Sequence, residues 1–321
     1  MPSPSPRCCW RRRSCACWRS TRSRRCSRTS AGSRAVADPR PRDVLHEPAW
    51  LRALLIGAAV LIMLGLVVLP LLMVLGAAFG DGFRAWWAAL REPDAVAALR
   101  LTLFTAAIVI PVNAVFGTLM AWAVTRFEFR FKRPLLALID LPFAVSPVVA
   151  GLCLVLLFST THGWFAGLLE QWDVRILFAR PGIVLATLFI TFPFVVRELI
   201  PLMQQQGSDE ELAARSLGAG AWTMFRRVTL PNIKWGLLYG VLLCGARAMG
   251  EFGAVSVVSG HIRGLTNTLP LHIEILYNEF DSTAAFAAAS LLSGLALVTL
   301  IIKFWLEARH GDAIAKSHRR H

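Results

Sequence analysis

Residues 53–80 read ALLIGAAVLIMLGLVVLPLLMVLGAAFG, an apolar run without a charged side chain. A helix of about 20 apolar residues crosses the hydrocarbon core of a bilayer, so this run is long enough to span a membrane. The composition of the chain agrees, because 55% of its 321 residues are hydrophobic, only 17% are charged, and the mean hydropathy is +0.55. The sequence therefore predicts an all-α integral membrane protein rather than a soluble or disordered chain.

Five further apolar segments follow the first one. One of them is interrupted by prolines, and another reaches the length of a span only with its flanking residues. They cover residues 101–125, 135–158, 181–196, 235–259 and 282–302. We predict six transmembrane helices in a membrane domain at 47–310, followed by a short basic cytoplasmic tail at 311–321.

The formal net charge of +14 is concentrated at the N-terminal end. Residues 1–42 hold 12 Arg and one acidic residue, Asp38, whereas residues 43–321 hold 22 basic and 19 acidic residues. The basic charge therefore does not form a face of the folded body, and we expect no nucleic-acid partner. Five of the seven Cys lie in the same region without the paired spacing of a zinc site. We interpret residues 1–46 as a disordered tail or the product of a misassigned start codon.

The basic residues of the remaining chain indicate its orientation. Lys and Arg are enriched in cytoplasmic loops near membrane spans. If the N-terminus is inside, the inner segments 126–134, 197–234 and 303–321 contain 14 basic residues, and the three outer segments contain six. Both termini are therefore predicted to be cytoplasmic, with membrane lipid around the spans.

The inner segment 197–234 reads RELIPLMQQQGSDEELAARSLGAGAWTMFRRVTLPNIK. Ser208 and Glu211 have the spacing of a capping box, which predicts the start of a helix. Gly218 suits the left-handed residue that ends a helix. A second short helix is predicted at 221–228.

We expect Pro231 to end this second helix, because proline lacks the N–H that the next turn would need. The two helices would then expose apolar side chains at Leu217, Trp222 and Phe225. Such an apolar ridge suits a groove in another protein. Packing of the loop on its own membrane domain is the alternative that the residues leave open.

The same loop resembles the signature loop of type I ABC importer permeases. That pattern is Glu-Ala-Ala, three residues, Gly, nine residues and Ile-x-Leu-Pro. Leu212-Ala213-Ala214, Gly218 and Val228-Thr229-Leu230-Pro231 match it in register, with Leu212 in place of the Glu. Glu211 directly precedes Leu212, which leaves open whether it supplies the carboxylate. The resemblance implies a coupling helix that docks into a cytoplasmic ATPase through Glu211, Leu212, Ala213, Ala214, Leu217, Gly218, Trp222, Phe225, Leu230 and Pro231.

Residues 229–281 are similar to the sulfate permease subunits of this family, and the resemblance extends over about 47–310. It implies a six-helix permease of the MetI-like fold in the bacterial inner membrane, with sulfate or thiosulfate as cargo. It also implies a sister permease (CysT), two copies of an ATPase (CysA) and a periplasmic sulfate/thiosulfate-binding protein. Molybdate permeases share the segment at 247–253, so a molybdate or other oxyanion permease is the alternative.

Arg247 and Glu251 lie four residues apart in one predicted span, which places them within pairing reach. Ionisable groups at this depth are expensive and tend to pair away from lipid. They could form a gate on an anion path or an ion pair that fixes helix packing, and the neutralising effect of Glu251 favours packing. Arg263, the only cation of the outer loop 260–281, is predicted either to contact the binding protein or to lie in a solvated turn.

The sequence lacks the GxxxxGK[ST] pattern that cradles phosphates, so we expect ATP hydrolysis on a partner subunit. It also lacks the HExxH and GxSxG motifs, and we expect no catalytic residue, cofactor or metal. A secondary transporter driven by an ion gradient is a second class of function. Many such transporters contain two repeated halves, and this sequence shows no clear repeat.

Overall fold

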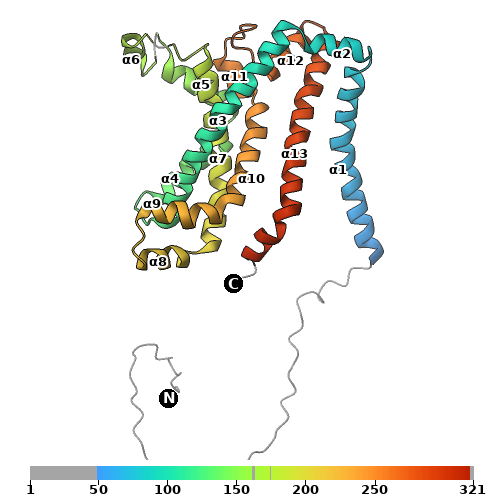
Figure 1. Ribbon diagram of the computed structural model, residues 1–321. Coiled ribbons are helices and arrows are strands. Elements are labelled where there is room, and N and C mark those ends of the chain that lie inside the picture. The colour runs from blue at the N-terminus through green and yellow to red at the C-terminus, as the bar shows by residue number, and fades with distance from the viewer. Residues whose placement is uncertain (1–48, 161–162, 174, 319–321) are drawn as a thin grey trace, which may run out of the picture. The chain divides into compact units, whose positions relative to one another are not determined.

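A computed structural model describes residues 49–160, 163–173 and 175–318, so the basic tail at 1–46 lies outside the described residues. The chain divides into two compact units, residues 1–58 and 59–321, and only 49–58 of the first is described. All regular elements in the described ranges are helices (Figure 1). They are α1 (Ala49–Ala78), α2 (Phe83–Leu90), α3 (Pro93–Arg126), α4 (Lys132–Ala144), α5 (Pro147–Phe158), α6 (Ala166–Gln171), α7 (Arg180–Gln206), α8 (Asp209–Ser216), α9 (Ala221–Met224), the π-helical turn η1 (Phe225–Thr229), α10 (Leu230–Met249), α11 (Gly253–Val258), α12 (Leu269–Asn278) and α13 (Ser282–His318).

Four helices in the described ranges are long and apolar enough to cross a membrane, and a fifth span is possible if a bent pair counts as one. The four are Trp50–Ala78, Pro93–Arg126, Arg180–Gln206 and Ser282–Leu306. They contain the second, fourth and sixth apolar segments that the sequence predicts and all but the last two residues of the first. The all-helical membrane architecture is thus confirmed, and the count of six spans stays a prediction.

The third predicted span is not one straight helix. Its residues form α4 and α5, which meet at an angle of 112°. Val145 and Ser146 between them are extended, with ψ of 137° and 136°. The residue before a proline avoids the helical region, so Pro147 forces this break and then starts α5.

The fifth predicted span also differs from the expectation. Helix α10 begins at Leu230, earlier than predicted, and ends at Met249. The chain then turns at Gly250 and continues as the short helix α11. Helix α11 packs closely on α5, because a Cβ added at Gly253 would lie 2.9 Å from the Cβ of Pro147.

Helices α3, α7 and α10 form the core of the second unit, and each packs against the other two. Small residues allow the close approach, since a Cβ at Gly117 would lie 2.7 Å from Cγ1 of Val195. A polar contact joins the same three helices, with the Nδ2 group of Asn113 donating to Thr191 Oγ1 at 2.7 Å and contacting Cys244 Sγ at 3.4 Å. All three of these residues are buried.

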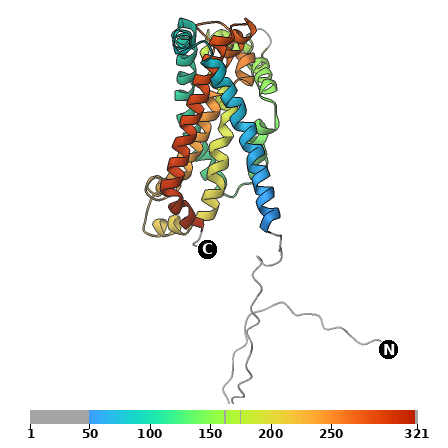
Figure 2. The same cartoon turned by 90° about the vertical axis from the view of Figure 1, so that its right-hand side faces the viewer.

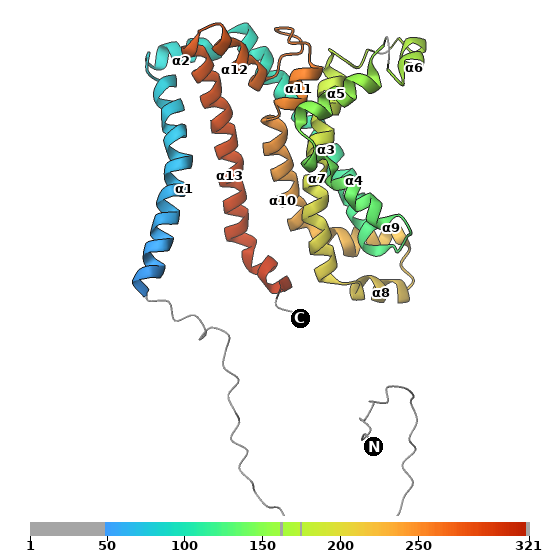
Figure 3. The same ribbon diagram turned by 180° about the vertical axis from the view of Figure 1, so that it is seen from behind.

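Within residues 59–321 the long helices run alongside one another (Figure 2). Helices α8 and α9 lie at one end, and α2, α6, α11 and α12 lie at the other (Figures 1 and 3). Many apolar side chains of α13 and α3 are exposed, and no residue in the most apolar stretch of α1 is buried. Apolar surface on helices of this length suits lipid or another membrane subunit.

Candidate functional site

The inner segment 197–234 folds into a compact pair of short helices beyond the end of α7. Helix α8 ends at a left-handed glycine, Gly218, with φ of +86°, as the sequence predicts. Helix α9 follows after Gly220 and leads through η1 into α10. We call residues 208–229 the α8–α9 hairpin.

One buried carboxylate, that of Glu211, fixes this hairpin to α3 and holds its two ends together. Oε2 of Glu211 lies 2.7 Å from Nε of Arg126 at the end of α3. This is a close ionic contact in which the N–H is not aligned for a hydrogen bond. Oε1 of Glu211 accepts a hydrogen bond of 2.7 Å from Thr229 Oγ1 in η1. The first turn of α8 is thereby joined to α3 and to η1.

Helix α8 begins directly after Ser208, as predicted, but the predicted capping-box hydrogen bonds are not formed. Ser208 makes no side-chain hydrogen bond to the start of α8, and its backbone lies at φ −120° and ψ 5°. The carboxylate of Glu211 turns instead to Arg126 and Thr229, since a charged partner gives a stronger contact than a backbone amide. Leu212, by contrast, is 59% exposed. The buried carboxylate of this loop is therefore at position 211.

Polar contacts hold the other side of the hairpin. Asn232 Nδ2 donates to Oε2 of Glu210, and Gln206 Nε2 donates to the Asn232 carbonyl at 3.0 Å. Arg126 also donates from a terminal nitrogen to the Met203 carbonyl at 3.3 Å. The contacts connect α8 with the end of α7 and the start of α10.

The predicted break at Pro231 is also wrong, because α9, η1 and α10 form one continuous helical path. The amide of Leu230 donates to the carbonyl of Phe225, five residues earlier. Proline in a regular helix clashes with the carbonyl four residues before it. The wider π turn directly before Pro231 relieves that clash, and such turns are frequent at functional sites.

The exposed ridge is present, with one exception. Leu217 is 89% exposed and Trp222 is 71% exposed, as predicted. Phe225 is only half-exposed, because its ring lies between Trp222, at 6.0 Å, and Trp122 of α3, at 5.5 Å. Sequence reasoning missed Trp122 and Arg126, since both lie far from the loop in the chain. Of the other predicted docking residues, Ala213 and Pro231 are exposed and Ala214 and Leu230 are half-buried.

Arg247 and Glu251 form the predicted ion pair, with Nη1 of Arg247 2.7 Å from Oε2 of Glu251. They do not share one helix, because α10 ends between them. Glu251 is 2% exposed, and its Oε1 also accepts the Ala254 amide at 3.1 Å at the start of α11. The arrangement fastens the junction of α10 and α11.

The outer-loop cation Arg263 is engaged within the chain. Its guanidinium pairs with the carboxylate of Glu279, just after α12. Both side chains are partly exposed, at 41% and 51%. Arg263 is therefore an ion-pair residue at the edge of a turn, next to Gly264 with φ of +76°.

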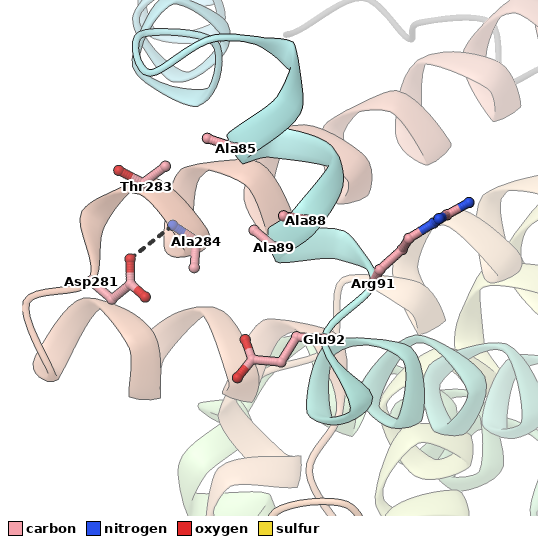
Figure 4. A pocket seen from close by; sticks show the side chains of 8 residues that line it. All are labelled: Ala85, Ala88, Ala89, Arg91, Glu92, Asp281, Thr283 and Ala284. Atoms are coloured by element: carbon pink, nitrogen blue, oxygen red, sulfur yellow. Dashed lines mark hydrogen bonds between the residues drawn. The ribbon is translucent and has the colours of Figure 1, made fainter.

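A hollow of about 460 Å³ lies between α2 and the start of α13 (Figure 4). Its walls are small alanines, and the carboxylates of Glu92 and Asp281 face it. Asp281 accepts the Ala284 amide at 3.1 Å and so caps α13. Arg91 points away and stacks on Trp87 at 4.8 Å. No metal-binding cluster of three or more His, Cys, Asp or Glu occurs in the part of the chain that the structure describes.

The family model of the "binding-protein-dependent transport system inner membrane component" matches residues 113–311, and the chain belongs to this family. The match contains the whole α8–α9 hairpin. The chain is therefore a multi-pass membrane transport protein and not an enzyme.

Curated relatives narrow the class. The chain is 51% identical to the sulfate transport system permease protein CysW of Escherichia coli K12, over 81% of this chain and 89% of that protein. It is 51% identical to the chloroplastic sulfate permease 2 of Chlamydomonas reinhardtii, over 86% and 74%. Identity to the permease protein CysT of E. coli K12 is 37%, over 81% and 93%. A bacterial ABC transporter that imports alginate shares the fold at a TM-score of 0.67 and 16% identity, over 84% of this chain and 96% of that one.

Proposed function

We propose that the chain is the CysW-type permease subunit of an ATP-driven importer of sulfate and thiosulfate. The observation that carries this proposal is the identity of about half to CysW proteins over four fifths of the chain. Identity to CysT is lower, at 37%, which favours the CysW position in the assembly. A CysT-type chain would then be the sister permease.

The assembly would also contain two copies of a CysA-type ATPase and a periplasmic sulfate/thiosulfate-binding protein. The names of the relatives describe a transport system rather than a single chain. The related alginate transporter forms a complex with a periplasmic protein that holds its cargo. This arrangement fits a chain that lacks its own phosphate-binding loop.

The α8–α9 hairpin is the contact that would couple this chain to the ATPase. Leu217 and Trp222 present exposed apolar surface, which suits a groove on a partner. Glu211 links α8 to α3 and, within the hairpin, to η1, which leads into α10, so a displacement of α8 would be transmitted to two core helices. The pair of Arg247 and Glu251 would act in packing at the end of α10.

The same proposal includes the topology. The six spans would be α1, α3, the bent pair α4 and α5, α7, α10 with α11, and α13. The hairpin end would face the cytoplasm with both termini, in agreement with the excess of basic residues in the inner segments.

Growth complementation tests the cargo. The chain would be expressed in a bacterial mutant that lacks its CysW-type permease but retains the other subunits. We expect growth on sulfate and on thiosulfate as sole sulfur sources. Rescue of a molybdate-uptake mutant without rescue of the sulfate mutant would contradict the proposal.

A further inference from the structure

A second cavity, of about 370 Å³, lies at the end of the second unit opposite the α8–α9 hairpin. One stripe of α3, including Arg100 and Phe104, forms its main wall. Arg180, the first residue of α7, and the turn at Gly264 and Leu265 complete it. The cavity thus brings together two arginines that are far apart in the sequence.

Neither arginine has a partner within the described part of the chain. The ion pairs and hydrogen bonds there leave the guanidinium groups of Arg100 and Arg180 unused. Of the other outer arginines, Arg263 pairs with Glu279 and Arg91 stacks on Trp87. Arg84 and Arg175 also have no partner among the described residues, but they do not line this cavity.

Two unpaired cations beside one cavity repel each other, and a bound anion relieves that repulsion. The N-terminus of α7 adds partial positive charge at the same place. None of the described residues that line the cavity carries a carboxylate, and the Asp94 carboxylate lies just outside, with Oδ1 3.7 Å from a Cβ added at Gly264. A cavity lined by charges of one sign concentrates the opposite ion.

The chemistry of the lining indicates the kind of anion. A guanidinium presents a planar fork of N–H donors that matches the oxygens of sulfate and phosphate. The remaining wall is apolar and accessible, with Phe104 48% exposed and Leu265 56% exposed. The other side chains of the wall carry no hydrogen-bond donors, so the two arginines are the side chains that can donate to a bound anion.

We propose that Arg100 and Arg180 form a binding site for a tetrahedral oxyanion group at the outer end of the permease. The outer location rests on the proposed function, because the topology is part of that function. Free sulfate and the phosphate of a lipid headgroup present the same chemistry to the two arginines. The site binds one of these two, and the experiment below separates them.

Arginine modification tests the site directly. The full transporter, purified in detergent and depleted of phospholipid, is treated with phenylglyoxal, and peptide mass spectrometry measures the modification rate of each arginine. We expect added sulfate to slow modification of Arg100 and Arg180 several-fold relative to chloride at equal ionic strength. The exposed outer residues Arg84 and Arg175 serve as internal controls and should keep their rates. A second arm adds short-chain phosphatidylglycerol instead of sulfate.

Protection by sulfate identifies a free-anion site, and protection by phosphatidylglycerol alone identifies a headgroup site. Unchanged rates in both arms overturn the proposal. The variant Arg100→Gln should remove the protection of Arg180, and Arg180→Gln that of Arg100, whereas Arg175→Gln should preserve both. Protection of Arg180 that persists in Arg100→Gln also overturns a shared site.

This readout does not depend on transport. If sulfate protects the two arginines but the transporter moves no sulfate, the proposed function fails and the site stands. If sulfate is imported but neither arginine is protected, the site fails and the function stands. Retention of the ATPase by each variant during purification confirms that it folds.

Discussion

The Nε atom of Arg126 lies 2.7 Å from Oε2 of Glu211, and this contact joins the last turn of α3 to the first turn of α8. The other oxygen of the same carboxylate accepts a hydrogen bond from Thr229 in η1. The pair is well buried, with side-chain exposures of 14% and 10%. A single carboxylate therefore fixes the α8–α9 hairpin to α3 and also holds α8 against η1, which leads into α10.

Arg126→Gln should destabilise the chain strongly, because it leaves the buried charge of Glu211 without its cation. Loss of one partner of a buried pair costs about 3–5 kcal/mol. The free energy of unfolding in detergent, measured by denaturant titration, should fall by this amount. The matched control is Lys132→Gln, since the pair of Lys132 and Glu128 leaves Glu128 91% exposed and is worth about 1 kcal/mol or less. Equal losses in the two variants would contradict the anchoring role of Glu211.

Gly218→Arg should abolish co-purification of the ATPase while membrane insertion remains normal. Gly218 has φ of +86°, and nothing lies within 4 Å of an added Cβ. The new side chain therefore adds bulk to the exposed surface beside Leu217. Gly82→Arg is the control. Gly82 has φ of +88° and equally open surroundings, but it lies directly before α2, at the end of the second unit opposite the hairpin. If Gly82→Arg lost the ATPase as well, backbone strain rather than the hairpin surface would explain the result.

Glu251→Gln should separate packing from anion attraction. Gln retains an oxygen that accepts the Ala254 amide, but it removes the charge that pairs with Arg247. If the pair serves packing, the double variant Arg247→Gln with Glu251→Gln should retain most sulfate uptake. If Arg247 attracts the anion, Glu251→Gln alone should raise uptake and the double variant should abolish it. Uptake of labelled sulfate by cells distinguishes the two outcomes.

The buried residue His272 should make stability depend on pH. It lies in α12, outside the predicted spans, and is 1% exposed, and neither of its ring nitrogens has a hydrogen-bond partner among the described residues. Burial lowers the pKa of His272 below its ordinary value of 6.5, against the opposing effect of the nearby acids Glu92 and Asp94. The unfolded chain then binds the proton more readily than the folded chain.

Stability should therefore be unaffected by this group above about pH 6.5 and should fall as the pH drops below that value. The loss is at most about 1.4 kcal/mol for each pH unit between the two pKa values. Unfolding temperatures at pH 7.5 and 5.5 would be compared for the parent and for His272→Gln. An identical pH dependence in both proteins would exclude His272 as its source.

Local sequence signals predicted much of the fold. Apolar runs located the long helices. Gly218 marked the end of α8 because a glycine that adopts the left-handed conformation ends a helix without help from distant residues. Pro147, the first residue of α5, explains the break between α4 and α5, although the sequence alone does not give the angle of 112°. Exposure of Leu217 and Trp222 followed from their place in a short, polar helix pair.

Contacts between distant segments were not predictable in this way. The capping-box pattern considers only contacts between Ser208 and Glu211 at the start of α8. Its hydrogen bonds do not form because Arg126, from the distant helix α3, offers Glu211 a charged partner. Phe225 is likewise covered by Trp122, a residue of α3 that lies far from the loop in the sequence. The cavity that Arg100 and Arg180 line depends on how α3 and α7 pack together. Because the two arginines are far apart in the sequence, no local pattern predicts it.

Sulfate uptake into proteoliposomes tests the central claim most directly. The chain would be reconstituted with its CysT-type partner and the binding protein, with or without the CysA-type ATPase, and ATP would be supplied on the ATPase side. We expect uptake of labelled sulfate only when both the ATPase and ATP are present. Uptake of equal rate without the ATPase would contradict the assignment of this chain as an ABC importer permease.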